Sequence, residues 1–458
     1  MRRTWTLAIL TGLLLAPAIP ASAEAVPRPA AAPLTPIQHV VVLMQENHSF
    51  DNLLGGWCNQ KPSRCPAGGI PSSVTLSDGT VVTPSVAPDI VPRAAHEVAA
   101  QAAAIDDGKM DGWQNVCAAP YACISYYTAA SEPNLIALAN AYGVEDHAFT
   151  LADSPSWGGH MNEFAATTDG FTGDNPGDGS LTLAGWGCDS GLLAQWKAPG
   201  SKVLQHVPSC VPDYSLNPVR YPYGGAFEAT PVAHVPTIMD EMDAASPPVT
   251  WNIYGATPGG SGYSWAGCPT FAACLDTSQG KHLVDNSKFF TDAAAGKLPS
   301  VSFVMPHVGE SQHNGQHNSA GDNWIGKVAS AVMSSPDWPS TALIITWDDC
   351  GCFYDHVPPP LAPDGRQEGP RVPFIVVSPY AKPAHTDSTT TSSTGSILAF
   401  IESTFGLAPL TANDANAYNL SGMFSLTSAP RLVHPRMKWR KLPPSYYRVN
   451  PAAARDGT

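Results

Sequence analysis

The chain has 458 residues, of which 43% are hydrophobic and 14% are charged, and its formal net charge at pH 7 is −14. This composition is that of a globular protein and excludes a disordered chain. The acidic balance also argues against a nucleic-acid-binding protein, which normally carries a basic surface. The 45 Pro and 39 Gly residues indicate many ordered loops.

The N-terminus has the pattern of a secretory signal. The charged pair Arg2-Arg3 precedes an apolar run over 7–17, and a small-residue cleavage site ends at Ala23. The run is too short to span a bilayer, and the pair is a poor match to a twin-arginine signal. We expect a secreted protein, extracellular or periplasmic, with a signal peptide over 1–23, an Ala/Pro-rich arm over 24–36 and a single folded domain over 37–458.

The ten cysteines form near neighbours along the chain, which is typical of local disulfides in an exported protein. The pairs are Cys58 with Cys65, Cys117 with Cys123, Cys188 with Cys210, Cys268 with Cys274, and Cys350 with Cys352. A bridge within the last pair would be strained because one glycine separates its members, so the state of that pair stays open. No two CxxC pairs occur, which argues against a zinc–thiolate site.

Short apolar runs with β-branched residues predict buried parallel strands, and these alternate with helical patterns. In chain order we expect a strand at 39–44, a helix at 133–142 and a strand at 301–305. A helix at 324–333 and a strand at 342–347 follow, and then a strand at 372–378 and a helix at 396–405. Polar segments rich in Gly and Pro predict insertions at about 58–92, 168–232 and 255–290. The alternation predicts an α/β fold whose mainly parallel sheet is covered on both faces.

Two expected strands end in oxygen-bearing side chains: Glu46-Asn47 follows the first, and Asp348-Asp349 follows the strand at 342–347. In open α/β sheets, chemistry collects where strands end. Carboxylate and amide oxygens suit divalent cations, and three clustered carboxylates without a cation would repel one another. The alternative is that each acidic pair caps a following helix. Matching strand ends favour a divalent metal ion, whose identity the sequence leaves open.

Ser156 lies in the segment SPSWGGH (154–160), where small neighbours would let a ligand approach its hydroxyl. A serine beside a divalent metal can attack phosphorus, although such a segment is also typical of an ordinary turn. Imidazoles can donate to phosphoryl oxygens or protonate a leaving group, whereas a single histidine is more often structural. The candidates near these segments are His96, His160, His307, His313, His317 and His356.

The C-terminal segment 431–448 contains six basic residues, interleaved aromatic residues and no acidic residue. It has two interpretations. Such a segment could contact anionic lipid, or it could pack across the surface of an acidic protein. We favour the second.

Several motifs together resemble one family. The segment HVVVLMQENHSFDNLLG (39–55) closely resembles the opening motif of the bacterial phosphoesterase family that contains non-haemolytic-type phospholipases C and acid phosphatases. Further matches follow in family order at 108–113, 311–313, 321–325, 346–360 and 369–383, so the resemblance spans residues 37 to about 410. It implies an alkaline-phosphatase-like α/β/α sandwich with long loop insertions.

The resemblance also implies roles for individual residues. The implied metal ligands are Glu46, Asn47, Asp348, Asp349 and the nucleophile Ser156. His96, His313 and His356 match histidines that surround the phosphoryl group, His160 is a further anion contact, and His317 competes with His313 because it lies one helical turn away. The chain departs from many relatives at Cys350-Gly351-Cys352, where they carry two glycines. The regions 168–232 and 255–290 match nothing, so the substrate stays open.

We therefore expect a secreted, metal-dependent phosphoesterase that acts through Ser156, with phospholipase C-type activity on phospholipid or phosphorylated head groups. An acid phosphatase acting on phosphomonoesters is the alternative. A non-catalytic surface-binding protein on the same scaffold would have lost a ligand, and none is missing. A sulfatase-like relative would need a C/S-x-P-x-R motif, which the sequence around Ser156 lacks. We expect neither a nucleic-acid nor an obligate protein partner, and at most a transient contact with a membrane surface.

Overall fold

The computed structural model describes residues 36–177, 185–213, 215, 230–444 and 446. The expected signal peptide and nearly all of the expected arm lie outside these residues, as do parts of the 168–232 insertion and the end of the basic C-terminal segment. In the part of the chain that is described, no helix combines the length and apolar character needed to cross a bilayer.

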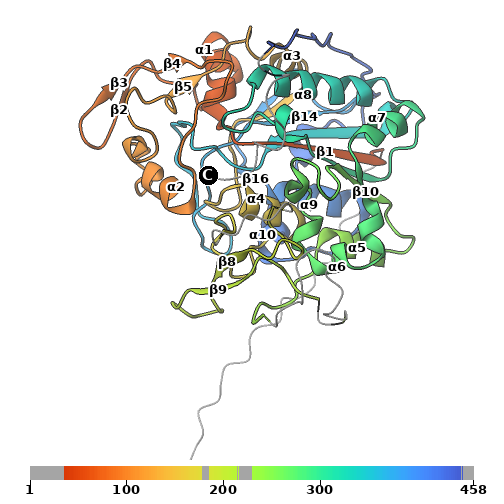
Figure 1. Cartoon of the computed structure of the whole chain (residues 1–458). Helices are drawn as coiled ribbons and strands as arrows, with labels where there is room; N and C mark the ends of the chain where they lie inside the picture. The colour runs from red at the N-terminus through yellow and green to blue at the C-terminus, as the bar shows by residue number, and fades with distance from the viewer. Residues whose placement is uncertain (1–35, 178–184, 214, 216–229, 445, 447–458) are drawn as a thin grey trace, which may run out of the picture.

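An eight-stranded mixed sheet forms the centre of the molecule, in the order β11-β10-β12-β1-β13-β14-β6-β15 (Figure 1). Its strands are β1 (His39–Gln45), β6 (Gly143–Glu145), β10 (Trp251–Gly255), β11 (Leu283–Asp285), β12 (Val301–Val304), β13 (Thr341–Trp347), β14 (Phe374–Val377) and β15 (Thr386–Asp387). β1 pairs in parallel with both β12 and β13. All four expected strands are present, and the mainly parallel sheet is confirmed.

β14 is the exception, since it is antiparallel to both β13 and β6. No helix lies between β13 and β14 in the structure, so the chain starts β14 at the edge where β13 ended. A parallel neighbour would have required a crossover connection. The long loop between these two strands therefore remains at the carboxyl end of β13.

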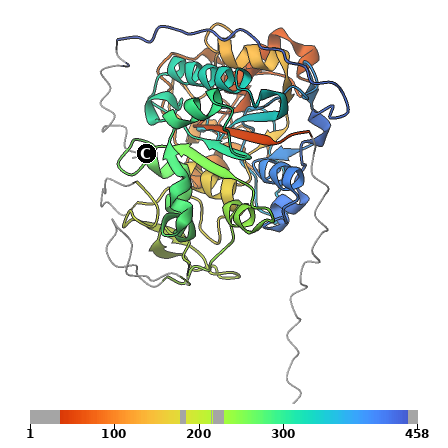
Figure 2. The same ribbon diagram turned by 90° about the vertical axis from the view of Figure 1, so that its right-hand side faces the viewer.

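Helices cover both faces of the sheet (Figures 1 and 2). One layer contains α3 (Pro133–Ala141), α7 (Ser287–Ala294) and α8 (Asn318–Met333). The other contains α4 (Ser156–Ala165), α5 (Ile238–Ala244), α9 (Gly395–Phe405) and α10 (Ala412–Asn416). The three expected helices are confirmed, with α8 beginning six residues earlier than the sequence indicated. The result is the expected α/β/α sandwich, held by a large apolar core of buried strand and helix residues.

The three expected insertions differ in kind. The first carries α1 (Gly56–Gln60), β2 (Val74–Thr75), β3 (Val81–Val82) and β4 (Ser85–Val86). β4 pairs with β5 (Ser125–Tyr126), and α2 (Val98–Ile105) follows along the chain. A small separate hydrophobic core holds this region together. The second contains the hairpin of β8 (Leu193–Trp196) and β9 (Gln205–Pro208). The range 255–290 is more than an insertion, because besides α6 (Ala272–Leu275) it supplies β11, the edge strand of the central sheet. A further short pair joins β7 (Ala148–Phe149) to β16 (Ser392–Ser393).

Four of the five cysteine pairs form the disulfides expected from their spacing: Cys58–Cys65, Cys117–Cys123, Cys188–Cys210 and Cys268–Cys274. Cys350 and Cys352 are buried free thiols whose sulfur atoms lie 3.7 Å apart. The absence of a disulfide between these two thiols agrees with the strain expected of a bridge across a single glycine.

Candidate active site

The two acidic pairs lie side by side at the carboxyl edge of the sheet. β1 and β13 are adjacent and parallel, and their register sets Gln45 opposite Trp347, so the next residue of each strand leaves the sheet at the same level. The backbone N–H of Asn47 donates to Asp348 Oδ1 at 2.9 Å. The structure thus brings Glu46, Asn47, Asp348 and Asp349 into one buried cluster, which we call the carboxylate cluster.

Local backbone geometry presses these two loops together. Asn47 has a φ of 61°, in the left-handed region that asparagine tolerates better than most residues. Opposite it, Gly351 has a φ of 53°, and a Cβ there would lie 2.3 Å from the Asn47 carbonyl oxygen. Only glycine fits at that position. The Cys-Gly-Cys sequence therefore keeps the one small residue that this close approach requires.

Ser156 reaches the carboxylate cluster from the other helix layer. It is the first residue of α4, and its hydroxyl lies 3.2 Å from Glu46 Oε2, 3.4 Å from Asn47 Oδ1 and 3.5 Å from Asp349 Oδ2. The helix N-terminus adds a partial positive charge beside it. A Cβ at Gly159 would lie 2.8 Å from the Asp348 carbonyl oxygen, so this glycine lets α4 approach the cluster. In the sequence we had assigned the small residues to ligand access instead.

His160 and Glu163 follow Ser156 on the same face of α4, at the spacing of successive helical turns. His160 Nε2 lies 3.0 Å from Glu46 Oε1, and its Nδ1 lies 3.4 Å from Glu163 Oε2. Burial lowers the pKa of His160, but the hydrogen bonds that the ring donates to the Glu163 and Glu46 carboxylates outweigh burial and raise the pKa to about 10. The imidazolium contacts Glu46 itself, whereas the sequence had suggested contact with a substrate anion.

Ionisation of the carboxyl groups in the carboxylate cluster is unfavourable without a cation. Burial, followed by the neighbouring Asp348 carboxylate, raises the pKa of Glu46 well above its usual value. The same two causes, in the same order, raise the pKa of Asp349. A divalent cation would remove this repulsion. In the described residues, Glu46, His160 and Asp348 also place ligand atoms within 4.8 Å of one another.

The Asn47 amide supplies a second sign that a cation fits. His313 Nδ1 lies 3.1 Å from the Asn314 carbonyl oxygen and so carries a hydrogen, which leaves Nε2 of the neutral ring as an acceptor. That Nε2 lies 3.0 Å from one amide atom of Asn47. Since Nε2 accepts a hydrogen bond, that amide atom is the nitrogen. The amide oxygen then lies 3.0 Å from both carboxylate oxygens of Asp349. Oxygen atoms this close repel one another, and a cation bound between the Asn47 amide oxygen and the Asp349 carboxylate would remove that repulsion.

His96 and His313 lie together beside the carboxylate cluster, with their ring centroids 6.2 Å apart, and Trp265 stacks on His313. Burial and then the His96 charge lower the pKa of His313 to about 4, so its ring is neutral at pH 7. His96 Nδ1 lies 3.0 Å from the Ala94 carbonyl oxygen, while its buried Nε2 has no hydrogen-bond partner among the described residues. This unpaired nitrogen points to a ligand group.

The structure does not bring His317 or His356 into contact with the carboxylate cluster. His317 precedes α8, and its Nδ1 lies 2.7 Å from Asp89 Oδ2. His356 uses both ring nitrogens elsewhere: Nδ1 lies 2.6 Å from Asp51 Oδ2, and Nε2 lies 2.9 Å from the Ala67 carbonyl oxygen. Between His313 and His317, which the sequence left open, it is therefore His313 that reaches the site. The rings of His317 and His356 are held by protein partners.

His356 belongs to a second buried group, which we call the arginine cluster. Arg371 Nε donates to Asp355 Oδ1 at 2.8 Å, and Arg371 Nη2 donates to Asp51 Oδ1 at 3.2 Å. Asp51 opens the short helix η1 (Asp51–Gly55) that follows the first motif. The arginine cluster therefore joins the 39–55 motif to the DHVPPP segment at 355–360 and to the residues that precede β14.

Two residues of the site escaped the sequence analysis. Glu163 could be placed beside Ser156 and His160 only from helical spacing, and the sequence around Ser156 was interpreted as a turn. His48 is buried between Tyr127 and Phe353, its ring nitrogens have no partner among the described residues, and burial lowers its pKa to about 3. Its backbone N–H donates to the Asp349 carbonyl oxygen at 3.0 Å, which adds a second link between the two ligand loops. Its place directly after Glu46-Asn47 was the signal that could have identified it.

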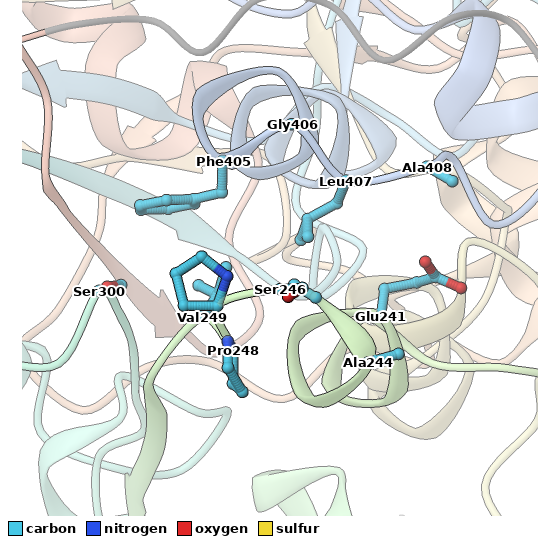
Figure 3. A pocket seen from close by; sticks show the side chains of 12 residues that line it. Glu241, Ala244, Ser246, Pro248, Val249, Ser300, Phe405, Gly406, Leu407 and Ala408 are labelled. Carbon is cyan, nitrogen blue, oxygen red and sulfur yellow. The ribbon is translucent and has the colours of Figure 1, made fainter.

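A further pocket lies away from this chemistry. A cavity of about 420 Å³ opens between the end of α9 and α5, lined by Phe405, Leu407 and Glu241 (Figure 3). Val249 and Ser300, which also line it, precede β10 and β12, so this cavity lies at the opposite edge of the sheet from the carboxylate cluster. None of its lining residues belongs to the site described above.

A serine hydroxyl among carboxylates at the strand ends of an α/β/α sandwich is an arrangement suited to hydrolytic chemistry. The chain belongs to the Phosphoesterase family, whose model matches residues 37–408. It is thus an enzyme that hydrolyses phosphoric esters, and the family resemblance seen in the sequence is confirmed.

The chain is also similar to individual curated proteins and to solved structures. The chain is 26% identical to "Phospholipase C A" of Mycobacterium tuberculosis over 468 aligned residues, which cover 88% of this chain and 80% of that protein. It is 32% identical to "Non-hemolytic phospholipase C" of Burkholderia pseudomallei over 202 residues, which cover 35% of this chain and 29% of that protein. A solved structure described as an alkaline phosphatase superfamily protein from Vibrio parahaemolyticus overlaps 84% of this chain and 71% of its own, with 12% identity and a TM-score of 0.39.

Proposed function

We propose that this phosphoesterase is a phospholipase C-type enzyme that uses Ser156 to cleave the phosphodiester of a phospholipid or of a related head-group ester. The supporting observation is the position of the Ser156 hydroxyl, which lies within 3.5 Å of Glu46, Asn47 and Asp349 in a buried site. The relatives named phospholipase C support the substrate class.

A divalent cation would be held by Glu46, Asn47, Asp348 and Asp349, with Ser156 beside it. These oxygen donors suit a hard cation. When bound, such an ion supplies positive charge that stabilises an ionised serine and the phosphoryl oxygens. On the protein side, the His160–Glu163 pair holds Glu46 from behind, and His313 holds the amide of Asn47. The donor set is thus positioned from two sides before any ligand arrives.

The side chains of the site then divide the chemistry between them. Ser156 Oγ attacks phosphorus, an Oγ–P bond forms, and the P–O bond to the diacylglycerol breaks. His96 Nε2 is the free imidazole nitrogen that can take the Ser156 proton and give it to the departing alcohol. Later it can take a proton from the water that cleaves the phosphoserine and return it to Ser156 Oγ. His313 acts as a positioning residue, because its neutral ring is already engaged with Asn314 and Asn47. The N-terminus of α4 favours the negative charge that develops at Ser156.

The test uses the Ser156→Ala variant, with Ser154→Ala as the matched control, because Ser154 is also buried and lies two residues earlier. Both are assayed on p-nitrophenylphosphorylcholine and p-nitrophenyl phosphate. We expect Ser156→Ala to lose roughly 10³-fold or more in kcat, the scale seen when a nucleophile is removed. The control should keep nearly full activity. Wild-type turnover by Ser156→Ala on both substrates would rule out Ser156 as nucleophile.

Phosphomonoesters are the alternative substrates. A monoester dianion is best bound where a lysine or arginine adds positive charge. Among the described residues, no lysine or arginine is ion-paired or hydrogen-bonded to Glu46, Asp348 or Asp349. The Arg93 charge does reach His313, where it helps to lower the pKa of the ring, so the described cations do not decide between a monoester and a diester. The ratio of turnover on phosphatidylcholine to turnover on simple monoesters separates the two.

We also infer that the enzyme works outside the cytoplasm. Four disulfides within the described residues favour an oxidising compartment. A substrate in a lipid bilayer agrees with that location.

A further inference from the structure

The C-terminal strap, defined here as residues 431–442, runs along the outside of the helix layer formed by α3 and α8 (dark blue in Figure 2). Two asparagines hold its backbone. Asn134 on α3 accepts from the Lys438 N–H at 2.6 Å and donates to the Lys438 carbonyl oxygen at 2.9 Å. Asn323 on α8 does the same for Arg440, at 2.9 and 2.8 Å. The strap packs across the protein surface, as the sequence analysis favoured.

Side chains on one side of the strap fasten it further. Leu442 is buried, and Met437 packs against the main core. Arg440 Nη2 lies 3.6 Å from the buried Asp322 carboxylate, which itself accepts hydrogen bonds from the first turn of α3. These contacts fix the direction in which the remaining side chains project.

The other side chains point away from the protein. Arg436, Lys438 and Lys441 are exposed, and within the described residues none of them forms an ion pair. Trp439 is 71% exposed, and Leu432 is 56% exposed. A chain with a net charge of −14 therefore presents one local row of unpaired cations with a tryptophan among them. Packing on the acidic body leaves these groups unexplained.

The strap also leads toward the edge of the sheet that carries the site. Beyond it, the Tyr446 ring lies 6.1 Å from the ring of His317. His317 directly precedes α8, four residues after His313, which contacts the carboxylate cluster. A surface bound along the strap would thus lie beside the loop that forms one wall of the site.

We propose that the C-terminal strap docks the enzyme on an anionic lipid bilayer. Lysine and arginine are attracted to anionic head groups, and tryptophan favours the interface between head groups and acyl chains. The biological role of this docking rests on the proposed function, because an enzyme that cleaves a phospholipid must reach its substrate at a membrane. Binding itself requires no catalysis and is measured separately.

The first experiment reverses the three exposed cations together, as Arg436→Glu, Lys438→Glu and Lys441→Glu. Co-sedimentation with vesicles of phosphatidylcholine and phosphatidylglycerol should show binding weakened by roughly 100-fold or more, since each cation near an anionic surface contributes about a fivefold factor. The wild-type protein should also release at high salt. The matched control reverses three exposed lysines elsewhere, Lys61, Lys202 and Lys281, and should keep most of the binding.

The second experiment tests the tryptophan. Trp439→Ala should weaken vesicle binding several-fold, whereas Leu361→Ala, which removes a 64% exposed side chain outside the strap, should not. If the charge reversal abolished binding but Trp439→Ala bound like the wild type, the proposal would be overturned in favour of an acidic polymer as the partner. Equal loss in the charge-reversal control would overturn it in favour of a general charge effect.

Soluble-substrate assays distinguish this inference from the proposed function. The strap variants should hydrolyse p-nitrophenylphosphorylcholine at the wild-type rate while losing turnover on anionic vesicles. A wild-type enzyme inactive on every phosphodiester would refute the proposed function and leave vesicle binding intact. Wild-type vesicle binding by the charge-reversed strap would refute the docking proposal and leave the soluble activity intact.

Discussion

The carboxylate cluster and the arginine cluster are both buried groups of acidic side chains attached to the 39–55 motif, yet they are balanced in opposite ways. In the arginine cluster, Arg371 faces both Asp51 and Asp355, and His356 contacts Asp51. In the carboxylate cluster, Glu46, Asp348 and Asp349 have a single positive partner in the described chain, His160, which lies on Glu46. The first cluster contains its own counter-charge. The second leaves a deficit of positive charge.

This difference separates a structural role from a functional one. In a buried ion pair with its partners in place, the charges already balance one another, and removing one partner is strongly destabilising. A buried acidic group that lacks its counter-charge is stable only when a cation or protons enter it. The amide oxygen of Asn47, which faces Asp349, belongs to the second kind of group. Asp51, Asp355 and His356 also place ligand atoms within 4.8 Å of one another. Because Arg371 already balances their charge, the comparison favours the carboxylate cluster as the place of a metal ion.

The largest effect is expected in catalysis. Asp349→Asn removes one ligand and should lower kcat for phosphodiester hydrolysis by roughly 10³-fold. The metal-free variant should be no less stable than the metal-free wild type, because the substitution removes a repelled charge. Activity assays and thermal unfolding in a chelator check both parts. A metal-free variant much less stable than the wild type would show that the Asp349 charge is already balanced.

Removing the counter-charge of the arginine cluster should act on stability. Arg371→Met leaves Asp355 buried without a positive partner and Asp51 with His356 alone. The free energy of unfolding should therefore fall by about 3–5 kcal/mol. The matched control is Arg366→Met, which breaks a partly exposed pair with Asp364 and should cost less than about 1 kcal/mol. Urea unfolding measures both. Equal losses in the two variants would contradict the role given to Arg371.

Metal removal should affect the two clusters differently. Chelation should lower the stability of the wild type, and a cation at 100 times its Kd should restore about 2.7 kcal/mol. In Asp349→Asn, the same addition should have little effect. His356→Gln should respond like the wild type, since the arginine cluster needs no ion. The measurement is the shift of the unfolding midpoint with metal concentration in all three proteins.

The smallest effect should appear as a pH dependence. Burial opposes the charge of His356, but the hydrogen bond to Asp51 raises its pKa to about 9, above the usual 6.5. A raised pKa contributes stability that is complete below pH 6.5 and disappears as the pH rises through 9. His356→Gln should therefore lose about 2 kcal/mol at pH 6 and almost nothing above pH 9.5, by the size of the shift for a partly exposed ring. Unfolding curves at both pH values test this, and a loss that grows with pH would have the wrong sign.

The sequence predicted the parts of the site that follow from strand endings. Continuous apolar runs located β1 and β13, and the side chains that follow them proved to be neighbours. It could not predict the direction of β14, which depends on the route of a loop that contains no helix. Strands of two or three residues, such as β6, β11 and β15, are too short to show a periodicity.

The histidines show the same limit more sharply. The family motif grouped His356 with His96 and His313, but its contacts with Asp51 and the Ala67 carbonyl are visible only in three dimensions. In the other direction, Ser156, His160 and Glu163 are spaced for one helix face. The Ser, Pro and Gly residues around them are typical of a turn, and that local pattern concealed the helix.

Metal analysis of the purified protein tests the central claim most directly. After equilibration with divalent cations and removal of the excess, the wild type and His356→Gln should each retain a single ion per chain, and Asp349→Asn should retain almost none. A wild type that binds no ion, or an ion that is lost in His356→Gln and kept in Asp349→Asn, would contradict the account.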